Sequence, residues 1–162
     1  IDCMMATTAY RRDSILGDVE VGPGSVIHPG SFLDGRTNKV SIGQRTIVQE
    51  NASVQSSLDS ISIGESCIIE TGCIIGCSIG SSSVIRAGAR LLPGAHIGSS
   101  CIIGENVTIH AGEIVEDGTV VVGNPRAAYS RDIDRLRGQH EANLDARLKA
   151  LHGSMQDCQH KM

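Results

Sequence analysis

Three histidines are the side chains of this 162-residue chain best suited to proton transfer. A neutral imidazole can take a proton from an attacking hydroxyl or amine near neutral pH, which is the task of a general base. His28 and His110 each directly follow an isoleucine, so we expect both to point outward on a flat surface, with no inserted loop nearby to form a pocket. His96 is the third candidate. Because a solvated surface position is the ordinary one for histidine, the sequence predicts no catalytic residue.

Six cysteines are the other reactive side chains, and their spacing does not indicate a metal site. Cys73 and Cys77 lie four positions apart without a second pair, which is not typical of zinc ligands. Cys67, Cys73 and Cys101 instead occupy a small-residue position of a repeat, where a thiol packs as a compact hydrophobic group. We therefore expect reduced thiols, no metal and no cofactor. The sequence begins with Ile1, which leaves a removed targeting peptide open.

An aliphatic residue recurs at every sixth position over most of the chain. The longest run comprises Ile79, Ile85, Leu91, Ile97, Ile103, Ile109, Val115 and Val121. Upstream triplets with the same spacing are Val21, Ile27, Leu33; Ile42, Val48, Val54; and Ile63, Ile69, Ile75. Steps of nine, nine and four residues separate these groups, so insertions and one deletion are expected at corners. Ile15, Ala9 and Cys3 extend the register toward the start of the chain.

Two further positions of the hexamer support a strand followed by a corner. A small residue follows many of the aliphatics by four positions, and a turn-forming residue follows many by three. Gly, Asn and Asp accept a positive φ at the least cost. The turn-forming residues are Asp18, Gly24, Gly30, Asn51, Gly72, Gly88, Gly94, Asn106, Gly112 and Gly118. Three such units make one triangular coil, so the sequence predicts an all-β fold, a left-handed parallel β-helix of about seven coils.

The predicted domain organisation is a β-helix over residues 1–125, a helical segment over residues 126–152 packed on it, and a flexible tail over residues 153–162. Gly123-Asn124-Pro125 ends the repeat, because proline removes a strand hydrogen-bond donor. The period then changes to three or four residues, which is typical of one helix face. This apolar face comprises Ile133, Leu136, His140, Leu144, Leu148 and Leu151. Gly138 costs the helix about 1 kcal/mol and is a candidate break.

Charge and hydropathy exclude two classes of partner. The net charge is −4, and residues 1–125 carry 7 Lys/Arg against 13 Asp/Glu. An acidic body argues against nucleic acid as the main partner. No apolar run approaches the length needed to cross a membrane.

β-Helices of this repeat serve as γ-class carbonic anhydrases, acyltransferases or non-enzymatic assembly subunits, and the residues test each class. Residues 48–55 and 69–77 resemble the stretches that carry the three zinc-binding histidines of the γ-class anhydrases. Those positions hold Gln55, Thr71 and Gly76 here. Because none of the three can hold zinc, the sequence argues against zinc hydrolytic chemistry.

The acyltransferase class keeps one point in its favour. The segment Gly123-Asn124-Pro125-Arg126 resembles the way in which such transferases, and the γ-class anhydrases, leave the β-helix. The same residues equally serve to stop a strand. No phosphate-binding glycine loop is present, since the glycines are spaced for corners.

Polar side chains on the outer faces ordinarily keep a protein soluble. The residues predicted to contact a partner protein are Asp18, His28, Gln49, Glu50, Glu70 and Arg86.

The chain resembles the dynactin subunit 6 family over about residues 3–152. The similar stretches are residues 15–23, 26–29, 42–43, 48–52, 63–64, 70–73 and 144–152. The long acidic, proline-rich loop of the family's vertebrate members is replaced here by the short segment from Ser56 to Ser62.

The resemblance implies a non-catalytic assembly subunit of the dynactin pointed-end complex, which supports dynein-driven microtubule transport and cargo or adaptor targeting. The implied partners are dynactin subunit 5, the pointed-end actin-related protein and the larger zinc-containing pointed-end subunit. The implied location is cytoplasmic and cytoskeleton-associated. The isolated chain is expected not to form a homotrimer. The alternative is a γ-anhydrase-like or hexapeptide acyltransferase-like homotrimer without zinc chemistry.

Overall fold

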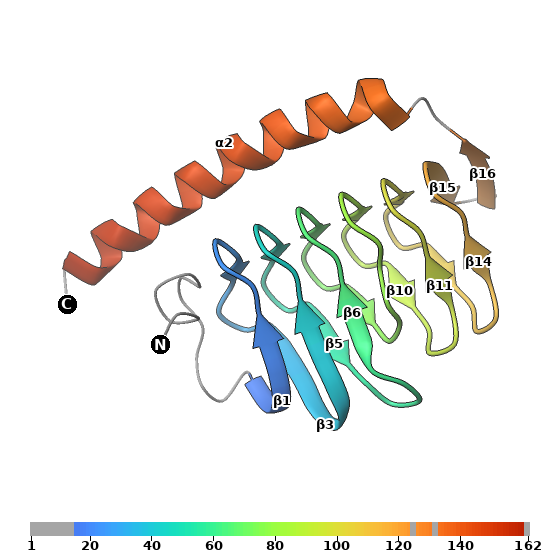
Figure 1. Cartoon of the computed structure of the whole chain (residues 1–162), viewed down its shortest axis with the longest axis horizontal. Helices are drawn as coiled ribbons and strands as arrows, with labels where there is room; N and C mark the ends of the chain where they lie inside the picture. Colours follow the sequence, from blue (N-terminus) through green and yellow to red (C-terminus); the bar gives the residue numbers. More distant parts are fainter. Residues whose placement is uncertain (1–14, 124–125, 131–132, 161–162) are drawn as a thin grey trace.

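The computed structural model describes residues 15–123, 126–130 and 133–160. Short strands stack into a three-sided prism, and one long helix, α2 (Ile133–His160), lies along the stack (Figure 1). The predicted all-β fold, a left-handed parallel β-helix with a C-terminal helix, is confirmed. The predicted number of about seven coils is too high for the described residues, which form about five turns. The prediction counted Cys3 and Ala9, which lie outside the described residues.

The first face of the prism is the one nearest α2, and we call it the helix face. Its parallel strands are β2 (Val26–Ile27), β4 (Ile47–Val48), β7 (Ile68–Ile69), β9 (Val84–Ile85), β12 (Ile102–Ile103) and β15 (Thr119–Gly123). β16 (Arg126–Ser130) returns antiparallel along β15 and ends the sheet. The chain then enters α2.

The other two faces share strands β1 (Ile15–Val21) and β3 (Phe32–Ile42), which run through a corner and pair with each other. One face, called the third face, continues through β5 (Ser53–Gln55), β8 (Ile74–Ile75), β10 (Arg90–Leu91) and β13 (Thr108–Ile109). The other, called the histidine face, continues through β6 (Ile61–Ile63), a bridge at Ile79, β11 (His96–Ile97) and β14 (Ile114–Val115).

The hexapeptide aliphatics form the core inside the prism. Parallel pairing keeps equivalent positions in register, so that Ile69, Ile85 and Ile103 stack on one another along the helix face. From Val21 to Val121 these residues are buried in one continuous cluster. Since each buried aliphatic contributes roughly 1.5–3 kcal/mol, the repeat is the main source of stability.

The corners use the left-handed backbone that their residues favour. The predicted glycines, together with Asn51 and Asn106, have positive φ. Asp18 was predicted to do so as well, but Gly17 takes that conformation instead, with φ of 77°. Glycine has no Cβ to clash there, so it accepts the turn at lower cost than its neighbour.

The small inward residues at the corner before the helix face connect successive coils. Ser83 Oγ donates to Gly98 O at 3.0 Å and accepts the Cys101 N–H at 3.2 Å. Hydroxyls and thiols at equivalent positions do the same, including Cys67, whose Sγ donates to Gly80 O at 3.2 Å. Burial raises the pKa of the Cys67 thiol to about 12, so this cysteine is a protonated structural group, as its slot predicted.

Helix α2 begins and ends later than predicted. Residues 126–130 form β16 instead of helix, and α2 continues through Gly138 without a break to His160, across most of the predicted tail. Leu144 and Leu148 are buried against the outward side chains of the helix face, with Leu151 partly buried beside them, which confirms that this stripe packs on the β-helix. The side chains of Ile133 and Leu136 lie outside the described ones.

Polar contacts fix the position of α2 on the helix face. The Arg45 guanidinium pairs with Asp145 and, at 3.1 Å, with Glu141. The His140 imidazole nitrogen Nε2 lies 2.6 Å from Ser66 O. No helix in the described part of the chain is long and apolar enough to span a bilayer.

Candidate active site

The irregular steps of the repeat all fall at one corner, where the third face meets the histidine face. Nine residues instead of six separate Leu33 from Ile42 and Val54 from Ile63, and only four separate Ile75 from Ile79. The second insertion, residues 56–60, therefore protrudes directly beside the shortened corner 76–78 of the next coil. A protruding loop next to a missing turn hollows the surface at this point.

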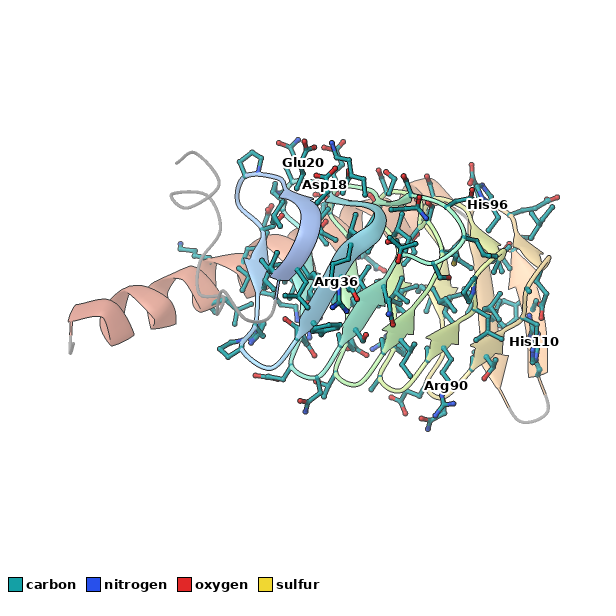
Figure 2. All side chains as sticks on the ribbon, turned by 90° about the horizontal axis from the view of Figure 1, so that it is seen from below. Asp18, Glu20, Arg36, Arg90, His96 and His110 are labelled. Atoms are coloured by element: carbon teal, nitrogen blue, oxygen red, sulfur yellow. The ribbon has the colours of Figure 1, made fainter. Side chains whose placement is uncertain are left out.

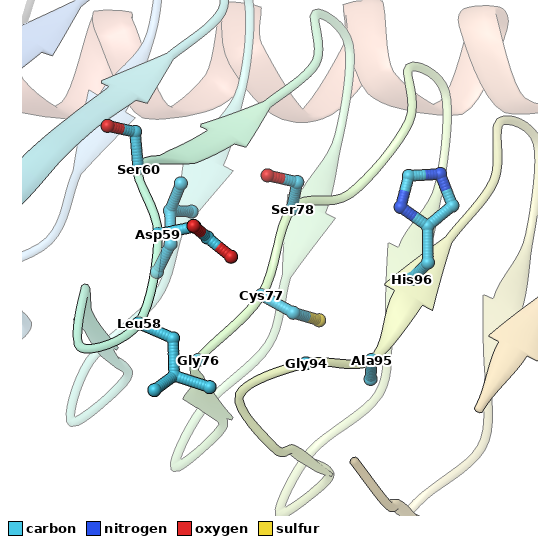
Figure 3. A pocket seen from close by; sticks show the side chains of 10 residues that line it. Leu58, Asp59, Ser60, Gly76, Cys77, Ser78, Gly94, Ala95 and His96 are labelled. Carbon is cyan, nitrogen blue, oxygen red and sulfur yellow. The ribbon is translucent and has the colours of Figure 1, made fainter. Parts of the chain in front are cut away.

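The resulting groove is a cavity of about 250 Å³. Asp59 of the inserted loop lies on one side, and His96, two coils further along the stack, lies on the other. Cys77 and Ser78 of the intervening coil lie between them (Figure 3). The remaining lining residues are Leu58, Ser60, Ile61, Gly76, Gly94 and Ala95. The groove thus contains an imidazole, a carboxylate and two hydroxyls.

His96 also borders a second hollow, of about 390 Å³, on its other side. Ile114 lies directly opposite His96 on the next strand, and Glu116 and Asp117 follow at the corner. Asp117 Oδ1 accepts the Ser99 N–H at 2.8 Å. The exposed His96 side chain therefore lies between two hollows and can be reached from both.

Cys77 is the only thiol lining the groove among the described residues, and its chemistry is suppressed. The side chain belongs to the hydrophobic core and is 5% exposed. Burial raises its pKa to about 12, because the thiolate would lose its hydration. A thiol that stays protonated near neutral pH is a poor nucleophile.

The other two histidines lie elsewhere. His28 is less solvated than predicted, because its side chain is 14% exposed and Nδ1 lies 3.2 Å from Glu50 Oε1. His110 is exposed and its backbone N–H donates to Glu113 Oε1 at 3.0 Å. Figure 2 shows His110 apart from His96 on the same prism.

Five of the six predicted partner-binding residues lie along one edge of the prism, at the corner after the helix face, and contact other residues of the chain. His28 pairs with Glu50. Glu70 lies 3.8 Å from Arg86 and 3.9 Å from Arg147 of α2. Gln49 accepts the hydroxyl proton of Thr71 at 3.2 Å.

Asp18 lies apart from this edge, near the histidine face (Figure 2). Partner binding at the six positions stays a prediction.

Two of the three positions that resemble the zinc-binding histidines of the γ-class anhydrases make other contacts. Gln55 Nε2 lies 3.4 Å from Asp34 Oδ2, and the Thr71 hydroxyl is engaged by Gln49. Within the described residues no three or more His, Cys, Asp or Glu side chains gather as a metal site would require.

The sequence contained a signal for the groove in the irregular steps of the repeat, which the regular hexapeptide pattern does not reveal. His96 was one of three candidates, whereas Asp59, Ser60, Cys77 and Ser78 were not considered together. Insertion and deletion at the same corner of neighbouring coils would have indicated them, because such a pair must create a step on the surface.

Comparison with known proteins supports the same fold. The family model described as "Bacterial transferase hexapeptide (six repeats)" matches residues 82–112. No curated protein matches the sequence significantly. The chain is similar to a hexapeptide transferase family protein from Anaplasma phagocytophilum, with 24% identity and a TM-score of 0.74 over 90% of this chain and 91% of that one.

Two further structures come from Caulobacter crescentus. PerB in complex with CoA and GDP-perosamine has 20% identity and a TM-score of 0.56. A variant of GDP-perosamine N-acetyl transferase, also with CoA and GDP-perosamine, has 20% identity and a TM-score of 0.53. Each match covers 78% of this chain and 58% of the other, so this chain spans little more than half the length of these neighbours.

These neighbours correct the sequence-based interpretation. The prediction of a non-catalytic protein is wrong, because the matching repeat model and the similar structures are those of transferases. The resemblance to the dynactin subunit 6 family finds no support among them. The predicted dynactin partners and the predicted location stay untested.

Proposed function

We propose that the protein is an acyltransferase that moves an acyl group from a thioester donor, such as acetyl-CoA, to an acceptor bound beside His96. The observation that carries the proposal is the position of His96. It is exposed, it borders both hollows, and it shares one of them with Asp59 of the inserted loop. A general base must reach the attacking group of its substrate, and this histidine is the one that lines a groove beside an inserted loop.

The proposed step is direct transfer. His96 takes the proton of the acceptor hydroxyl or amine as its oxygen or nitrogen attacks the thioester carbonyl carbon. The new C–O or C–N bond forms, the C–S bond breaks, and the thiolate leaving group takes the proton from the imidazolium. Because the Cys77 thiol is held protonated, we expect no acyl-cysteine intermediate.

The size of the groove suggests that a second copy of the chain completes the site. Small-molecule pockets usually enclose about 300–1,000 Å³, and this groove has about 250 Å³. Leu58 at its rim is 68% exposed and Ile114, next to His96, is 72% exposed. Large exposed apolar side chains near a groove are typical of an interaction surface. We therefore propose a homo-oligomer, whereas the resemblance implied a subunit of a hetero-complex that is not a homotrimer.

Thiol release from acetyl-CoA in the presence of acceptor panels tests the proposal. We expect His96→Ala to lower kcat by about 10²–10⁴-fold, the usual contribution of a general base. His110→Ala, which removes another exposed imidazole outside the groove, is the matched control and should retain the wild-type rate. Equal rates for wild type and His96→Ala, with the fold intact, would refute the proposed role of this residue.

A further inference from the structure

The shortened corner replaces one backbone hydrogen bond of the parallel ladder by a side-chain contact. At the regular corners, the N–H one position before a core aliphatic donates to the carbonyl two positions before the core aliphatic of the next coil. Val26 N to Thr46 O, at 2.9 Å, is one example. By this rule the Ser62 N–H would donate to the carbonyl of Cys77. It donates instead to the hydroxyl oxygen of Ser78, at 3.0 Å.

The deletion in the repeat is the physical cause of this exchange. A six-residue step leaves five residues between two core aliphatics, whereas only residues 76–78 lie between Ile75 and Ile79. The ladder is regular again directly after the corner, because Ile79 N donates to Ser62 O at 3.0 Å. The Ser78 hydroxyl therefore takes the place of the one carbonyl that the shorter corner does not supply, and satisfies a backbone donor.

The hydrogen bond joins the inserted loop to the floor of the groove. Ser62 belongs to β6, which the chain enters directly from the loop of residues 56–60, and Ser78 lines the groove. A second serine holds the other end of the loop. Ser56 is 2% exposed, accepts the Asn38 N–H at 3.0 Å and donates to Asn38 O at 2.5 Å. Serine hydroxyls therefore hold the loop at both of its ends.

The same hydrogen bond sets the position of the loop relative to His96. Ile79 forms bridges to the preceding and the following strand of the histidine face. Ser62, Ser78 and His96 are therefore consecutive outward residues on this face, and parallel strands lie about 4.8 Å apart. The Ser78 hydroxyl is turned away from His96 (Figure 3). This orientation leaves the groove open beside the imidazole.

We infer that Ser78 is a positioning residue of the proposed acyl transfer. By accepting the Ser62 N–H it holds the inserted loop at the distance from His96 at which the acceptor and the thioester fit between them. The inference rests on the proposed function and adds a residue to it that acts through the loop, not on the reacting atoms. Such a role has a large effect on rate, because a displacement of about 1 Å between reacting groups can lower it by about 10²-fold.

Amide hydrogen exchange, followed by NMR, tests the hydrogen bond itself. In Ser78→Ala the amide of residue 62 should exchange up to about tenfold faster than in the wild-type protein, the factor that one net hydrogen bond contributes. Ser78→Thr keeps a hydroxyl and should keep the protection. Ser62→Ala changes the other serine of the pair but keeps its backbone N–H, so residue 62 should stay protected. Equal exchange in wild type and Ser78→Ala would overturn the inference.

Thiol release from acetyl-CoA tests the positioning role, with the acceptor that gives the highest rate. We expect Ser78→Ala to lower kcat/KM by about 10–10²-fold and Ser78→Thr to restore it. The control Ser41→Ala changes the equivalent outward serine two coils earlier, outside the groove, and should retain the wild-type value.

Two outcomes separate this inference from the proposed function. An unchanged kcat/KM in Ser78→Ala, or an equal loss in Ser78→Thr, would overturn the inference even if His96→Ala abolishes transfer. Protection of residue 62 that depends on Ser78, without thiol release in the wild-type protein, would refute the proposed function and reduce Ser78 to a residue that only stabilises the fold.

Discussion

The helix face and the histidine face share one backbone geometry and one core, and they differ in the residue that precedes each core aliphatic. On the helix face these outward residues are Val26, Ile47, Ile68, Val84, Ile102 and Val120. On the histidine face they are Glu20, Ser41, Ser62, Ser78, His96 and Ile114. The apolar column must be covered and packs against α2, whereas the other column is mostly polar and can stay in water.

The corners that lead into the two faces differ as well. Every step into and out of the helix face is six residues long, from Val21 to Ile27 through Val115 to Val121. The insertions and the deletion fall at the corner that leads into the histidine face. A helix laid along a face requires a regular surface, while a binding groove requires an irregular one. The insertions and the deletion in the repeat therefore lie on the surface where we propose that this β-helix binds a substrate.

The largest effect on stability is expected from the cover of the helix face. Leu144 is fully buried, so Leu144→Ala should lower the free energy of unfolding by about 2–5 kcal/mol. The neighbouring Asn143→Ala changes an exposed side chain of the same helix and should have little effect. Urea unfolding measures both. An unchanged midpoint for Leu144→Ala would mean that α2 does not depend on this face.

A smaller effect should distinguish inward from outward serines. Ser83→Ala removes the partner of the buried Cys101 N–H, which should cost about 1–3 kcal/mol. Ser62→Ala, at an exposed position in the outward column of the histidine face, is the control and should stay close to wild type. Similar losses for the two variants would contradict the different roles assigned to the two positions.

The smallest effect concerns pH at the corner before β14. The Arg126 guanidinium beside Glu113 lowers the pKa of that carboxyl to about 2. A lowered pKa contributes stability above the unfolded value of about 4.3, and that contribution is lost as the pH falls toward 2. Because the pair is partly exposed, Glu113→Gln should cost no more than about 1 kcal/mol at pH 7. Unfolding measured from pH 7 to pH 2 should show this difference disappearing; a difference that persists at pH 2 would rule out the carboxylate as its cause.

The fold could be predicted from the sequence because the prism repeats one local rule. Each aliphatic, such as Ile85 or Ile103, fills the same inward slot, so the pattern survives insertions. The bounds of α2 were harder, since Gly138 weakens a helix locally while packing of Leu144 and Leu148 holds it.

The candidate site could not be predicted from the same rule. Asp59 and His96 are far apart in sequence and line one groove only because their coils stack nearby in space. Their outward positions carry no periodic signal. The hexapeptide pattern describes the core, which enzymes and assembly subunits share, and therefore it did not separate those two classes.

A crystal structure of the protein with bound CoA tests the central claim most directly. The account predicts that the CoA sulfur lies within hydrogen-bond reach of the His96 imidazole, in the groove between the loop of residues 56–60 and β11. CoA bound at a distant surface, with the groove closed by protein side chains of a second copy, would contradict it.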